Sequence, residues 1–134
     1  MNKICYLHLG FHKTASSSFQ ETCARNSELL GSFGITYPIF NCLASNRSSI
    51  CNHSQPIHSL FCNNPRNYPL NISCKVIDKM EEVNNSYRKQ LEGFLEGSSN
   101  IILSGEGIST LDKEGLEKLV EKIKSYNYKV YIFA

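Results

Sequence analysis

The chain has 134 residues, of which 41% are apolar and 19% are charged, and its formal net charge is +2. This composition suits one folded domain and excludes a collagen-like, coiled-coil or generally disordered chain. The nearly neutral balance gives no reason to expect a nucleic-acid partner, and no apolar run approaches the ~20 residues of a membrane span.

The chain opens with an apolar stretch, residues 4–9, which Gly10 ends. Apolar side chains at successive positions are typical of a strand buried on both faces. The stretch is too short for the core of a signal peptide, so we expect a cytoplasmic protein. Its six cysteines are then expected to be reduced thiols rather than disulfides.

A helix and a short strand follow. Residues 16–30 predict one helix, because Phe19, Cys23 and Leu30 recur at helical spacing. Residues 35–37 predict a second strand, closed by a proline.

The middle of the chain, residues 41–78, is rich in Asn, Ser and Pro. We expect a long connection there, with at most a short helix near residues 55–61. Connections of this length are uncommon in compact domains unless they are functional or disordered.

The last third returns to alternating helices and strands. Helices are predicted over residues 79–95 and 112–125, the second with Asp112 as its N-cap, and strands over residues 101–104 and 128–134. Alternation of this kind predicts one α/β domain over residues 1–134, built on a parallel, doubly wound sheet. Ligands of such sheets bind at the carboxyl ends of the strands.

Residues 10–18 combine features of a phosphate-binding loop between a strand and a helix. Gly10 lets the chain turn closely, and free N–H groups at a helix start favour an anion. Lys13 adds a positive charge, and Thr14, Ser16 and Ser17 add hydroxyl groups. Only two residues separate Gly10 from Lys13, whereas a Walker A loop needs four before its Gly-Lys pair. The spacing therefore favours a P-loop-like anion site that is not a nucleoside-triphosphate loop.

This loop resembles the 5′-phosphosulfate loop of sulfotransferases that use 3′-phosphoadenosine 5′-phosphosulfate (PAPS). The family pattern is Gly-x-x-Lys-Thr-Gly-Thr-Thr, often followed by Leu-Gln; here Ala15 replaces the second glycine and Gln20 matches the last position. Two further stretches are similar to family segments, Asn-His-Ser at residues 52–54 and a strand ending in Ser-x-Glu at residues 104–106. The resemblance covers the N-terminal portion of the family fold only, so we expect a truncated domain.

The resemblance implies sulfuryl transfer from PAPS to a hydroxyl or amine of an acceptor, either a carbohydrate or a small metabolite, without a metal ion. Lys13 would neutralise charge on the leaving phosphate. Either Glu106 or His53 would be the base, and the residues leave that choice open. The expected contacts to PAPS, or to its product 3′-phosphoadenosine 5′-phosphate, come from the loop: Gly10, Phe11, His12, Lys13, Thr14, Ala15, Ser16 and Ser17.

Two other functions remain open. One is an inactive remnant or nucleotide-binding module, because the family's ligands for the 3′-phosphate would follow residue 134. The other is a kinase-like phosphotransferase, which would need an acidic metal ligand. An apolar last strand also leaves a sheet edge through which the chain could form an oligomer.

Overall fold

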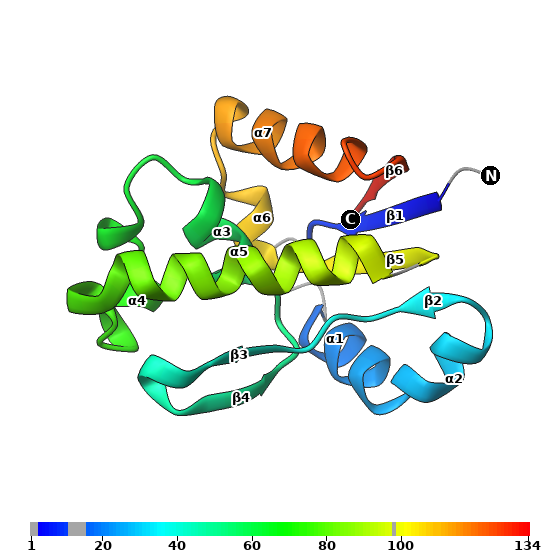
Figure 1. The fold of residues 1–134 in the computed structure, drawn as a ribbon, viewed down its shortest axis with the longest axis horizontal. Helices are drawn as coiled ribbons and strands as arrows, with labels where there is room; N and C mark the ends of the chain where they lie inside the picture. Colours follow the sequence, from blue (N-terminus) through cyan, green and yellow to red (C-terminus); the bar gives the residue numbers. More distant parts are fainter. Residues whose placement is uncertain (1–2, 11–15, 98) are drawn as a thin grey trace.

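A four-stranded parallel sheet forms the centre of the molecule (Figure 1). The computed structural model describes residues 3–10, 16–97 and 99–134. The strand order is β2-β5-β1-β6, so β1 lies between β5 and β6. Cys5 on β1 is paired with Ile101 on one side and Val130 on the other. The predicted mixed α/β architecture with a parallel sheet is confirmed; the strands are β1 (Lys3–His8), β2 (Ile35–Thr36), β5 (Asn100–Ser104) and β6 (Tyr128–Phe133).

The predicted helix over residues 16–30 is two helices, α1 (Ser16–Arg25) and α2 (Ser27–Ser32). The break is at Asn26, whose side-chain Nδ2 donates to the Thr22 carbonyl at 2.8 Å. An asparagine side chain that bonds the preceding turn competes with the regular helix and favours its interruption. Figure 1 shows α2 next to β2, near one edge of the sheet.

The long helix α5 (Met80–Gly97) and the helix α7 (Lys113–Lys124) confirm the two other helix predictions. The inward stripe of α5 includes Tyr87, Leu91 and Leu95, all fully buried. Asp112 caps α7, because its Oδ1 accepts from the Gly115 N–H at 2.7 Å. In Figure 1, α7 lies beside β6, at the other edge of the sheet from α2.

The segment 41–78 is not the long, mostly irregular connection that its composition predicts. It begins in the hairpin of β3 (Phe40–Cys42) and β4 (Arg47–Ile50) and continues through the predicted short helix, α3 (Ser54–Phe61). The 3₁₀ turns η1 (Leu43–Ser45), η2 (Pro65–Asn67) and η3 (Ile77–Lys79) and the helix α4 (Pro69–Ser73) complete it.

Buried polar side chains explain why this segment folds. Asn71 is fully buried, and its Nδ2 donates to the Pro65 carbonyl at 2.9 Å and to the Ser59 hydroxyl at 3.0 Å. Its Oδ1 accepts from Gln55 Nε2 at 3.0 Å. A buried polar network whose members are satisfied holds one conformation firmly. Some of the Asn and Ser residues whose abundance predicts a loop therefore belong to the buried core.

The edge strand β6 leaves Tyr131, Ile132 and Phe133 partly exposed, at 40% or more of their surface. An exposed strand edge with apolar side chains is a site where strands of other molecules can pair. Self-association through this edge stays a prediction. None of the helices in the described ranges has the length and apolar content needed to cross a bilayer.

Candidate functional site

The carboxyl ends of β1, β5 and β6 are joined by backbone hydrogen bonds. The Gly105 N–H donates to the His8 carbonyl at 3.2 Å, and the Leu9 N–H donates to the Phe133 carbonyl at 2.9 Å. Gly10, the next residue, has a φ of +59°, a conformation that residues other than glycine rarely adopt. The chain after β1 therefore leaves the sheet directly beside the chain after β5.

Most of the predicted phosphate loop falls in a stretch that the structure does not describe. Phe11, His12, Lys13, Thr14 and Ala15 lie outside the described residues. Its flanks are described: α1 begins at Ser16, and Ser17 is exposed in the first turn of α1.

The hydroxyl of Ser104, at the end of β5, connects both flanks of this loop. It lies 2.7 Å from Nδ1 of His8, the last residue of β1, and accepts from Nε2 of Gln20 on α1 at 3.2 Å. All three side chains are buried. The His8 ring contacts the rings of Phe19 and Phe133, with centroid distances of 4.4 and 4.8 Å, and burial lowers the pKa of His8. In the sequence, Ser104 and Gln20 are only parts of the family resemblance, and no local pattern predicts their contact.

Glu106 follows β5 at the start of the short helix α6 (Glu106–Ser109). Its Oε1 accepts from Asn52 Nδ2 at 3.2 Å. Its Oε2 is buried and has no hydrogen-bond partner among the described residues. Asn52 is itself oriented, because its Oδ1 accepts from the Ser54 N–H at 2.9 Å. A carboxylate held on one oxygen and unpaired on the other can accept a proton from a bound hydroxyl or amine.

His53, the other candidate base, is fully buried and bonded at both ring nitrogens. Nδ1 accepts from the Ser104 N–H at 2.9 Å, and Nε2 lies 2.6 Å from the Pro38 carbonyl, so Nε2 carries the proton. Burial lowers the pKa of His53 to about 4. In this arrangement no lone pair of the ring is free, so the geometry favours Glu106 as the base. His53 instead ties α3 to the end of β5.

His53 also makes a prediction about acid stability. Its pKa falls from 6.5 in the unfolded chain to about 4 in the folded one, so below pH 6.5 the unfolded state binds the extra proton. Stability is therefore lost as the pH falls from 6.5 to 4, by about 3 kcal/mol from this residue. Urea unfolding at pH 7.0 and 4.5 measures the loss. The variant His53→Gln keeps a donor for the Pro38 carbonyl and should be less stable at pH 7. Its free energy of unfolding should also change less between pH 7.0 and 4.5 than that of the wild type. An equal change in the two proteins would contradict the assignment of this pH dependence to His53.

The loop after β5 packs closely on the start of α3. A Cβ built on Gly105 would lie 2.4 Å from the Ser54 backbone nitrogen, and one built on Gly107 would lie 2.8 Å from Ser54 Cβ. Glycines at these positions let the segment carrying Glu106 lie against α3 without a clash.

Gly105→Ala is expected to lower the free energy of unfolding by about 3 kcal/mol, because backbone atoms have to move to admit the methyl group. Gly93→Ala is the matched control: it lies within α5 with nothing inside 4 Å of the added Cβ, so it should raise stability by about 0.5–1 kcal/mol. Thermal and urea unfolding of both variants give the comparison. Equal stability of the two alanine variants would refute the close packing.

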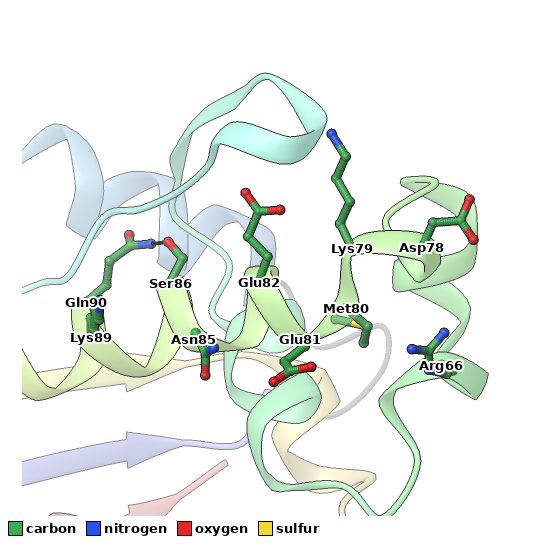
Figure 2. Close-up of a pocket in the computed structure, with 10 residues that line it drawn as sticks. All are labelled: Arg66, Asp78, Lys79, Met80, Glu81, Glu82, Asn85, Ser86, Lys89 and Gln90. Atoms are coloured by element: carbon green, nitrogen blue, oxygen red, sulfur yellow. Dashed lines mark hydrogen bonds between the residues drawn. The ribbon is translucent and has the colours of Figure 1, made fainter.

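A separate depression of about 790 Å³ lies along the start of α5, between η2 and η3. Figure 2 shows its charged side chains diverging: Lys79 and Glu82 point to one side of the helix, and Glu81 points to the other. Nη1 of Arg66 donates a hydrogen bond to the Ile77 carbonyl at 3.2 Å. These side chains do not converge on a common point, so this depression is a weaker candidate than the strand ends.

Comparison with known proteins adds no relative. No family model matches the chain, no curated protein matches it, and no solved structure matches it.

Proposed function

We propose that the chain binds PAPS at the carboxyl end of β1 and transfers its sulfuryl group to a hydroxyl or amine of an acceptor. One observation carries the proposal: Gly10 follows the strand β1 beside β5, and β5 is followed closely by Glu106, a half-buried side chain with one buried, unpaired carboxylate oxygen. The strand order puts β1 where the chain connections change direction, and open α/β sheets bind ligands at such points. On this proposal the sheet is doubly wound and the loop after Gly10 is P-loop-like.

Each part of the loop has a role in the proposed reaction. Backbone N–H groups at the start of α1 and the hydroxyls of Thr14, Ser16 and Ser17 hold the 5′-phosphate. The Lys13 ammonium group offsets negative charge on the leaving phosphate. The buried contacts of Ser104 with His8 and Gln20 support this role, because they hold the chain on both sides of the loop.

The proposed transfer is a single in-line displacement. The acceptor oxygen or nitrogen forms a bond to sulfur as the bond from sulfur to the bridging phosphate oxygen breaks. The electron pair leaves with 3′-phosphoadenosine 5′-phosphate, and the acceptor proton passes to Glu106. Catalysis of this kind depends on positioning and charge stabilisation, as in phosphoryl transfer.

The first test is a melting experiment with the product nucleotide. 3′-Phosphoadenosine 5′-phosphate at about 100 times its Kd should raise the melting temperature by roughly 10 °C, because it binds only the folded state. ATP with Mg²⁺ is the comparison ligand and should give a smaller shift at the same concentration. A larger shift with ATP would support a kinase-like phosphotransferase, and no shift with millimolar bisphosphate would refute the proposed donor.

A further inference from the structure

The strand β6 lies at one end of the sheet, and β1 is the only described strand that pairs with it (Figure 1). All six residues of β6 pair with β1 in one register, so the strand is regular over its length. Residues 130–133 are Val-Tyr-Ile-Phe and include no charge, proline or glycine. Natural proteins protect edge strands with charges, prolines or bulges. A regular apolar edge without these features is suited to pairing with another strand.

Alternate residues of β6 direct their backbone groups away from β1. The Phe133 carbonyl accepts from the Leu9 N–H at 2.9 Å, so the backbone groups of Phe133 face β1. Backbone groups of successive strand residues point to opposite sides of the strand. The N–H and C=O groups of Val130 and Ile132 therefore point to the outer edge, where they can bond to a further strand.

The side chains at the end of β6 are exposed on both faces of the sheet. Tyr131 is 46% exposed, Ile132 51% and Phe133 40%. Since side chains alternate along a strand, Tyr131 and Phe133 share one face and Ile132 lies on the other. The Tyr131 ring is stacked on Tyr6 of β1, with centroids 6.3 Å apart, and the Phe133 ring contacts His8. The two rings are therefore held in place without a partner.

An identical strand complements this edge in one antiparallel register. With Ile132 opposite Ile132 of a second copy, the outward N–H and C=O groups of both residues form a hydrogen-bonded pair. Tyr131 then lies opposite Phe133 of the second copy at the closer, non-hydrogen-bonded positions, where aromatic pairs stabilise a sheet. The pairing covers residues 130–134. Lys129 lies outside it, so no like charges oppose each other.

We propose that two copies of the chain pair through β6 as an antiparallel dimer with Ile132 on the two-fold axis. The two four-stranded sheets then form one continuous sheet. The other end of the sheet offers no comparable partner, because β2 has only two residues, Ile35–Thr36. Pairing of β6 with itself also closes the assembly, whereas pairing with a different edge would leave an open end for further copies. The dimer does not depend on the donor proposed above.

Sedimentation equilibrium of the full chain tests this dimer. Pairing through a single strand is a small interface, so we expect a Kd of about 1–100 µM. Ile132→Lys puts two positive charges on the axis and should raise this Kd about 100-fold, and Ile132→Glu should do the same. An equimolar mixture of the two variants should dimerise at least about tenfold more tightly than either alone, because opposite charges then meet on the axis.

Two further variants complete the experiment. Ile132→Pro removes an N–H that β1 does not use, so it should also give a folded monomer. Leu43→Lys is the matched control: Leu43 is 88% exposed and lies in η1, outside the sheet, so dimerisation should be unchanged. Melting curves check that each variant is folded.

The dimer is overturned if the wild type stays monomeric over this concentration range or forms only larger aggregates. It is also overturned if folded Ile132→Lys, Ile132→Glu or Ile132→Pro dimerises as tightly as the wild type. A mixture of the Lys and Glu variants that dimerises no better than either alone would rule out Ile132 on the axis. Loss of the dimer in Leu43→Lys would place the interface elsewhere.

Discussion

Lys13→Ala is expected to abolish most of the rise in melting temperature that 3′-phosphoadenosine 5′-phosphate gives. Removing a charged partner of the phosphate weakens such an interaction by about 1.5–3 kcal/mol, or roughly ten- to 150-fold in Kd. At a ligand concentration close to the wild-type Kd, a loss of this size leaves almost no stabilisation. Differential scanning fluorimetry over a range of nucleotide concentrations measures the shift for both proteins.

The control for this experiment is another lysine-to-alanine change. Lys79 lies in η3, on the depression along α5 and away from the strand ends (Figure 2). Lys79→Ala should keep the full nucleotide-dependent shift. A Lys13→Ala protein that retains the shift, or a Lys79→Ala protein that loses it equally, would contradict the assignment of Lys13 to the phosphate site.

Glu106→Gln is expected to lower kcat for sulfuryl transfer by about 10²–10⁴-fold, the range that general base catalysis typically contributes. The amide keeps an oxygen that can accept from Asn52 Nδ2, so the fold should be preserved. It cannot take the proton of the acceptor. Release of 3′-phosphoadenosine 5′-phosphate from PAPS, followed with small phenols and amino sugars as acceptors, measures the rate.

Two further readouts define this result. The bisphosphate should raise the melting temperature of Glu106→Gln as much as that of the wild type, since Glu106 has no proposed contact with the nucleotide. Glu82→Gln, a matched change in the other depression, should leave the rate unchanged. Equal turnover by Glu106→Gln and the wild type would show that Glu106 is not the base. If the wild-type chain shows no turnover, the proposal that it is an active sulfotransferase is wrong. The alternative of a nucleotide-binding module is then favoured.

Much of the sheet and its helices could be predicted from local patterns. The buried stripe of α5, with Tyr87 and Leu91 at helical spacing, and the cap at Asp112 are signals within a few residues of one another. The hairpin of β3 and β4 and the packing of α4 gave no comparable signal. They depend on contacts between distant residues, such as Gln55 with Asn71, and polar side chains in a buried network look like those of a loop in the sequence.

The candidate site also has a part that the sequence predicts and a part that it does not. Gly10 and the residues after it follow a recognisable order along the chain, whereas the choice between Glu106 and His53 depends on the surroundings of each side chain. The sequence could not show that both nitrogens of His53 are bonded to backbone groups, because Pro38 and Ser104 lie far from each other in the chain. The roles of the residues from Phe11 to Ala15 stay predictions.

The shared contact of Ser104 with His8 and Gln20 has a consequence for the entropy of binding. The residues on both sides of the loop are hydrogen-bonded to one hydroxyl. The conformational entropy of bringing the two ends of the loop together is therefore lost when the protein folds, and not when a ligand binds. Loss of that hydroxyl would move part of this entropy loss to the binding step. A residue with no contact to the nucleotide can therefore influence the protein's affinity for it. Sequence changes within the loop can be accommodated as long as the two ends of the loop keep their hydrogen bonds to Ser104.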